Sequence, residues 1–160
     1  MAAILKMHLT GGASNADPTL ALGGVSSSVE LSATALNNLF DNVSADEASA
    51  GDTEYRAIDV KNSGDASAVG TQIYMNPDTT SASTELDFGI EASPLGSTLS
   101  IANESTAPAA VTFSHYNTGT RLSLPDIAAA AYCRVWVRRV VSAAAPNLAT
   151  DTGTLNVDYA

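Results

Sequence analysis

Apolar and polar residues alternate in several short runs of the chain, which is the pattern of a β-strand that buries one face. In residues 55–61, Ile58 and Val60 fall on one face, and the turn-forming residues 62–65 follow. This order predicts a hairpin whose second strand covers residues 69–75. The alternation recurs in four later runs, at residues 86–91, 111–114, 133–138 and 154–159.

Turn-forming residues such as Pro77, Pro94 and Gly119 separate these runs. Short strands at such spacing predict an all-β fold, an antiparallel β-sandwich of about seven to nine strands that is immunoglobulin-like or jelly-roll-like. We expect each sheet to keep one face in water, because this explains the polar half of every alternation. The predicted core comprises Ile58, Val60, Ile73, Leu86, Phe88, Val111, Phe113, Val135, Val137, Leu155 and Val157.

One stretch carries a helical pattern instead. Apolar residues in 36–43 recur at spacings of three and four, which predicts one or two helical turns. Ser44 and Glu47 follow with the spacing of a capping box, in which each side chain binds the other residue's backbone amide. The alternative is an irregular loop whose apolar residues fill a gap in the core.

The first part of the chain has little to bury. Residues 11–35 are rich in glycine, serine and other small residues, as in extended arms and linkers. The sequence therefore predicts an N-terminal strand and extended arm over residues 1–35 and a β-sandwich domain over residues 36–160. We expect the arm to act at least in part through other chains, with strand pairing at the terminus as the alternative.

Composition and charge narrow the possible functions. The 160 residues include 17 acidic and 7 basic side chains, for a formal net charge of −10, and a nucleic-acid partner would require the opposite balance. The single cysteine, Cys133, cannot form an intrachain disulfide. No apolar run is long enough to span a bilayer, and residues 1–10 do not read as a signal peptide. We expect one domain with no nucleic-acid or membrane partner.

Candidate catalytic chemistry is sparse. His8 and His115 lie in no nucleophile motif, so we expect no enzyme activity, no catalytic residue and no cofactor. Six carboxylates fall within residues 41–59 without the spacing of a known calcium loop. We interpret this stretch as a solvated acidic loop with no metal site, and a bound cation is the alternative.

Basic residues gather near the C-terminus. Arg134, Trp136 and Arg138 share one face of a predicted strand, and Arg139 follows them. Tryptophan and arginine are the residues most enriched in binding hot spots, so these four form a candidate partner interface. The alternative is that Trp136 is a core residue and that the arginines pair with acids. We also expect a homo-oligomer in which residues 41–59 of one copy meet residues 121–139 of another.

Several short motifs are distinctive in combination. In chain order they are residues 9–15 (LTGGASN), 38–41 (NLFD), 46–48 (DEA), 51–56 (GDTEYR), 60–62 (VKN), 103–108 (NESTAP), 122–127 (LSLPDI) and 135–139 (VWVRR). Together they resemble a group of small virion structural proteins of tailed bacteriophages, and the turn at residues 60–62 is also similar to that of immunoglobulin-like modules. The motifs span nearly the whole chain, but none of them encodes a chemical activity.

The resemblance implies a structural role in a virion. We expect a capsid decoration or cement protein, which binds the major capsid protein or other virion proteins and resides in the host cytoplasm before assembly. The alternative is a tail, baseplate or fibre-associated protein, possibly a carbohydrate-binding module. Carbohydrate modules usually display clustered aromatic residues, whereas Tyr74, Tyr116 and Trp136 are scattered along this chain.

Overall fold

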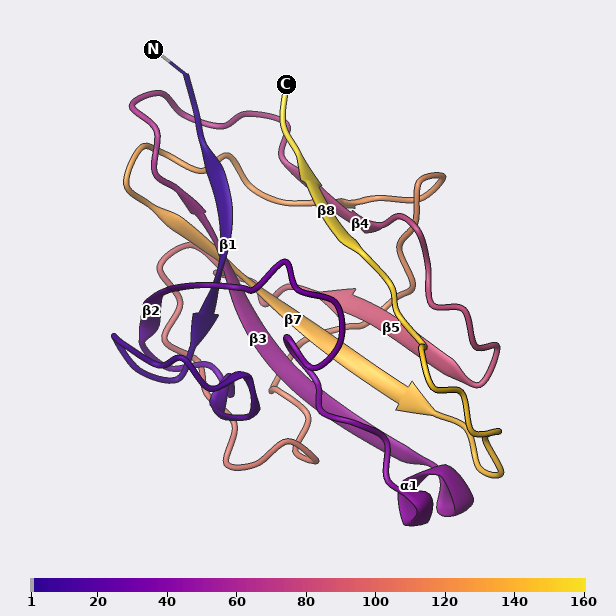
Figure 1. The fold of residues 1–160 in the computed structure, drawn as a ribbon. Helices are drawn as coiled ribbons and strands as arrows, with labels where there is room; N and C mark the ends of the chain where they lie inside the picture. Colours follow the sequence, from indigo (N-terminus) through magenta and orange to yellow (C-terminus); the bar gives the residue numbers. More distant parts are fainter. Residues whose placement is uncertain (1) are drawn as a thin grey trace.

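Two antiparallel sheets lie face to face in the computed structural model, which describes residues 2–160 (Figure 1). The larger sheet has the order β2-β1-β3-β7-β5, formed by β2 (Ser26–Glu30), β1 (Leu5–Thr10), β3 (Asp52–Asn62), β7 (Tyr132–Val141) and β5 (Thr84–Gly89). The smaller sheet has the order β6-β4-β8, formed by β6 (Leu122–Ser123), β4 (Gln72–Met75) and β8 (Leu155–Asp158). The two short helices are η1 (Pro18–Leu20) and α1 (Ala45–Ala50). The predicted all-β sandwich is confirmed.

The long strands β3 and β7 form the spine of the molecule. They pair without interruption from Asp52 opposite Val141 to Lys61 opposite Tyr132. Both strands show the predicted alternation, so residues of one kind stand opposite each other across the ladder. This register places Ile58 beside Val135, and it decides which charged residues meet.

The hydrophobic core fills the space between the sheets. Ile58 and Val135 of the large sheet and Ile73 of the small sheet are fully buried there. The predicted core positions that are buried are Ile58, Val60, Ile73, Phe88, Val135 and Val137, while Leu86, Leu155 and Val157 are partly buried against them. Val111 and Phe113 are not in this core, because their segment lies on the opposite face of the large sheet.

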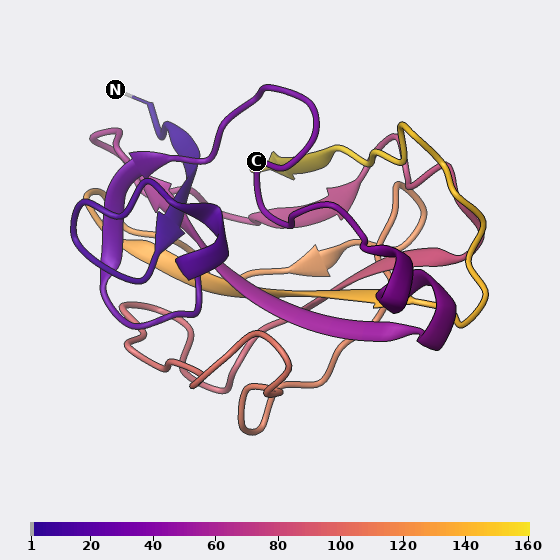
Figure 2. The same cartoon turned by 60° about the horizontal axis from the view of Figure 1, so that its bottom comes forward.

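That opposite face is covered as well. Much of the connection between β5 and β7 loops over it, on the side away from β4 and β8, before the chain returns to the small sheet at β6 (Figure 2). Its backbone meets the sheet directly, since Tyr55 N–H donates to Glu104 O and Arg134 N–H donates to Pro94 O. The expectation of one wet face per sheet is therefore wrong for the central strands, where Ala57 is completely buried.

Two predicted strand assignments need correction. The hairpin of residues 55–61 and 69–75 does not form, because β4 belongs to the small sheet and pairs with β6 and β8. The strand predicted at 111–114 is reduced to a single bridge between Ser114 and Phe88. In both cases the local alternation is real, but the strand that the segment pairs with lies elsewhere in the sequence.

The helix predicted over residues 36–43 is also wrong. Leu36 and Asn37 have φ of 69° and 55°, in the left-handed region that interrupts a right-handed helix. The segment is irregular and buries Leu39 in the core, as the alternative described. The capping box is confirmed: Ser44 and Glu47 bind each other's backbone amides and start α1.

Residues 1–35 do not form a separate arm in the part that the structure describes. β1 lies inside the large sheet between β2 and β3, with Leu5 opposite Asn62 and His8 opposite Asp59. Thr10 is fully buried and its hydroxyl donates to Ala57 O at 2.9 Å. The expected strand pairing at the terminus is therefore present, and the division at residue 35 runs through a continuous sheet.

Candidate functional site

The side chain of Arg134 is fully buried, and each nitrogen of its guanidinium group donates a hydrogen bond. Its Nε donates to Asp59 Oδ1 at 2.6 Å and its Nη2 to Asp59 Oδ2 at 3.2 Å, while both side chains are 0% exposed. The remaining donors reach Leu99 O and Gly24 O, each at 2.9 Å. This one guanidinium therefore ties together the sheet, the N-terminal segment and the covering loop.

Trp136 is buried beside this pair, with 0% of its surface exposed. The indole packs against Gly23, where an added Cβ would lie 2.9 Å from Trp136 Cη2. Trp136 is not exposed between the arginines, because the backbone of Leu99 in the covering connection lies against this face. The burial agrees with the alternative, in which Trp136 is a core residue.

Arg138 is the most exposed of the four candidate interface residues, with 31% of its side chain in solvent. Its Nε and Nη2 donate to Asp87 Oδ2 at 2.9 and 2.5 Å. The guanidinium carbon also lies 5.2 Å from the centre of the Phe113 ring. Arg138 thus holds the covering loop against β5 from the side facing solvent.

Arg139 points to the opposite face and anchors the irregular segment 31–44. Its Nη2 binds the Glu54 carboxylate, and its Nη1 donates to Asp41 O at 2.5 Å. The Phe40 ring centre lies 5.0 Å from the Arg139 guanidinium carbon and 5.5 Å from that of Arg56. Burial raises the pKa of Glu54, although Arg139 and Arg56 act in the opposite direction.

The predicted interface residues are therefore split between two faces. Arg134, Trp136 and Arg138 face the covering loop, and Arg139 faces the segment 31–44. Each arginine is paired with a carboxylate of this chain, as the alternative described. Asp87 could not be identified as the partner of Arg138 from the sequence, because the pairing depends on the register of the sheet.

A groove opens on the core side of the large sheet, beyond the end of the small sheet. It has a volume of about 1020 Å³ and lies between two irregular segments, residues 31–45 and 144–155. Met7, Leu86 and Val141 contribute to its floor together with Arg139. The small sheet has three strands against five, so it leaves this end of the large sheet uncovered.

The lining of the groove is mostly small or apolar. The two walls supply alanines, leucines and hydroxyl side chains, and Leu36 and Leu148 are exposed. The groove was not predicted from the sequence. The only signal was the alanine-rich composition of residues 143–149, which is compatible with any exposed turn.

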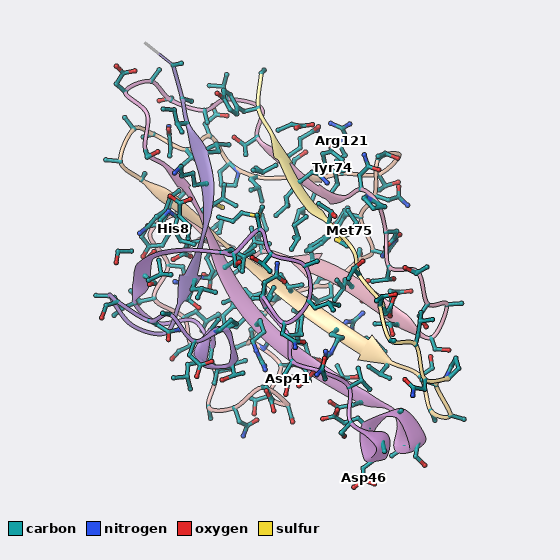
Figure 3. The ribbon with its side chains drawn as sticks, in the orientation of Figure 1. His8, Asp41, Asp46, Tyr74, Met75 and Arg121 are labelled. Carbon is teal, nitrogen blue, oxygen red and sulfur yellow. The ribbon has the colours of Figure 1, made fainter. Side chains whose placement is uncertain are left out.

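Carboxylates surround this end of the molecule. Asp41 and Asp151 line the groove itself, and α1 adds Asp46 and Glu47 beside its groove-lining alanines. Figure 3 shows Asp41 and Asp46 toward the end of the sheet that carries α1. The six carboxylates of residues 41–59 therefore do not form one acidic loop, since Asp59 is buried in its ion pair with Arg134.

Within the acidic stretch, Glu47, Asp52 and Glu54 offer carboxylate oxygens within 4.8 Å of one another. Arg139 already binds Glu54, and the Ser44 amide donates to Glu47. Two of the three carboxylates are therefore engaged by groups of this chain.

A second cluster surrounds His115, on the solvent side of β5. The His115 ring meets Leu86 O through Nδ1 at 3.1 Å and Asp78 Oδ2 through Nε2 at 2.7 Å. Burial disfavours the charged ring, but these two hydrogen bonds outweigh it and raise the pKa of His115. Nearby, the Asp87 charge raises the pKa of Glu85. His115 thus links its own segment to β5 and to the loop that carries Asp78.

Cys133 is fully buried in β7 and faces the core. Burial raises the pKa of its thiol to about 12, so the reactive thiolate is scarce at neutral pH. The residue therefore behaves as a small apolar side chain.

Comparison of the chain with family models, with curated proteins and with solved structures finds no match. Over residues 2–160, no helix is both long and apolar enough to cross a membrane. The candidate site is therefore defined by the geometry of this chain alone, and it centres on the groove that reaches β8 at Leu155.

Proposed function

We propose that this chain is a non-enzymatic structural protein of a tailed-bacteriophage virion, and that it decorates or cements the capsid by binding the major capsid protein. The observation that carries the proposal is the groove between residues 31–45 and 144–155. It has a volume of about 1020 Å³, is lined mostly by small and apolar side chains, and lies against the large sheet. Such a surface suits the docking of another polypeptide better than it suits a chemical reaction.

The internal ion pairs support the same role. Arg134, Arg138 and Arg139 each hold a loop or segment against the large sheet. A capsid protein has to maintain the conformation of its binding surface, and loops that are held to the sheet by internal ion pairs do this. The sequence motifs resemble those of small virion proteins of tailed bacteriophages, and this resemblance is the reason to propose a virion as the location.

The location on the virion can be tested with antibodies. An antibody raised against the purified chain should label intact particles evenly over the capsid, as seen by immunogold electron microscopy. Labelling restricted to the tail or baseplate would favour the tail-associated alternative, and unlabelled particles would contradict a virion role. Particles from a mutant lacking the gene serve as the control.

A further inference from the structure

We propose that the groove binds an extended, basic segment of a different protein, which adds to the small sheet as a strand beside β8. The inference goes beyond the virion role, since it concerns the chemistry of the docking surface whatever the particle. It rests on four features of the chain: the free edge of β8, the lining of the groove, the negative charge around the groove, and the internal contacts that already bind the basic side chains of this chain.

The edge of β8 is available for pairing. β8 is the last strand of its sheet and has β4 on one side only. Asn76 N–H donates to Thr154 O, whereas Met75 N–H turns away from β8 to Tyr116 O. Since antiparallel pairs alternate in this way, the backbone groups of Leu155 and Val157 point away from β4.

The free edge meets the groove where β8 begins, since Leu155 is the residue of β8 that lines it. Residues 151–154 continue this wall before the strand, and residues 31–45 form the other wall. Figures 1 and 2 both show segment 31–44 beside β8, on the side opposite β4. A strand added at Leu155 would therefore extend the three-stranded sheet over the uncovered end of the large sheet. Its alternate side chains would face the floor formed by Leu86 and Val141.

Charge determines which segment fits. Asp41 and Asp151 line the groove, and Asp46 and Glu47 stand on the helix that borders it. The one basic residue in the lining, Arg139, already binds Glu54 and Asp41. The net field is negative, so lysine or arginine at the ends of the incoming strand would be attracted and acidic residues repelled.

A second copy of this chain does not supply such a segment. Each of its seven basic side chains is engaged within the described chain: Lys6 with Glu30, Arg56 with Glu104, Lys61 with Ser27 O, Arg121 with Asp158, Arg134 with Asp59, Arg138 with Asp87, and Arg139 with Glu54. The head-to-tail contact expected between residues 41–59 and 121–139 would have to compete with these internal pairs. The occupant is a different protein with free bases.

Synthetic peptides test the proposal on the full-length protein. The probe is a soluble peptide of about ten residues with alternating valine and threonine at its centre and two lysines at each end. Two matched peptides serve as controls: one carries glutamates in place of the lysines, and the other carries N-methyl groups on alternate backbone amides. Binding is followed by NMR titration and by amide hydrogen exchange.

The lysine peptide should bind, shift the amide signals of Leu155 and Val157, and slow their exchange. The glutamate peptide should bind at least about tenfold more weakly, and added salt should reduce this difference. The peptide methylated on the face that pairs should lose binding, because it cannot donate to the edge of β8.

A pair of protein variants locates the site. Ala33→Trp fills the groove from its exposed wall and should abolish binding, while Ala109→Trp places the same side chain at an exposed position outside the groove lining and should not. The proposal is overturned if the lysine peptide does not bind at millimolar concentration, if the methylated peptide binds equally well, or if both variants behave alike. None of these outcomes bears on labelling of virions, so the two proposals can fail separately.

Discussion

Arg134 of β7 and Asp59 of β3 stand opposite each other in the sheet and form a two-point ion pair from which water is excluded. The same guanidinium donates to Leu99 O and Gly24 O, so the pair also fixes two loops. A buried ion pair is costly to desolvate and becomes favourable only when its remaining donors are satisfied. Here the guanidinium has a partner on each of its three nitrogens.

Removing one member of this pair should be far more damaging than removing both. Arg134→Met leaves the Asp59 charge buried without a partner and should lower the free energy of unfolding by about 3–5 kcal/mol. Adding Asp59→Leu to the same chain should restore part of this loss, because no uncompensated charge remains. Urea denaturation of the two single variants and the double variant measures the coupling. Strictly additive losses would contradict it.

The close approach of Gly23 to Trp136 gives a second prediction. Gly23 has φ of 88°, and an added Cβ would lie 2.2 Å from Leu99 O and 2.9 Å from Trp136 Cη2. Gly23→Ala should cost about 3 kcal/mol or more, since the backbone strain is joined by a clash with rigid groups. Gly96 is the matched control: its φ is 64°, but a Cβ there meets nothing within 4 Å.

Gly96→Ala should accordingly cost only about 1 kcal/mol, the strain of the left-handed backbone alone. Thermal or chemical denaturation of both variants gives the comparison. Equal losses of unfolding free energy in the two variants would show that the covering loop can shift to accommodate the added methyl group beside Trp136.

These features show where the sequence was informative. The alternation around Ile58 and Val135 predicted both central strands and the face that forms the core. It could not predict that the other face, with Ala57 and Trp136, is also buried. Polar residues at alternate positions normally indicate water, but Asp59 and Arg134 satisfy each other across the ladder. Only the register shows that they meet.

The pH dependence of stability should reveal His8. Burial lowers the pKa of His8 below its ordinary value of 6.5, and Lys61 adds to this effect. The unfolded chain therefore binds a proton more readily than the folded chain in the window just below pH 6.5, so stability rises with pH there. The contribution is complete above this window and is lost as the pH falls through it.

His8→Gln removes this titration and serves as the test. The difference in unfolding free energy between about pH 7.5 and about pH 5 should be smaller in the variant than in the wild-type protein. The comparison of the two proteins cancels the titration of the carboxylates. An identical pH dependence in both would contradict a lowered pKa at His8.

The N-terminal segment should be essential for folding. Deletion of residues 2–30 removes β1 and β2, exposes the edge of β3 and leaves Ala57 O without its bond from Thr10. We expect the truncated chain to lose cooperative thermal unfolding, as followed by circular dichroism. A truncated chain that still unfolds cooperatively would restore the view of residues 1–35 as an arm.

The sequence misled on this point because small residues suit two different environments. Glycine and serine favour flexible linkers, but they also permit the close packing seen where Gly23 lies under Trp136. The groove was equally hidden. Its walls are irregular segments without periodicity, and its size follows from the unequal width of the two sheets.

The proposed structural role on a phage capsid is tested most directly by counting the copies of this chain in each particle. Quantitative mass spectrometry of purified particles, with the major capsid protein as internal standard, gives the number of chains per virion. We expect a fixed ratio of this chain to the major capsid protein that corresponds to hundreds of copies per virion. A small multiple of three or six would place the chain in the tail, and its absence from purified particles would contradict the virion role.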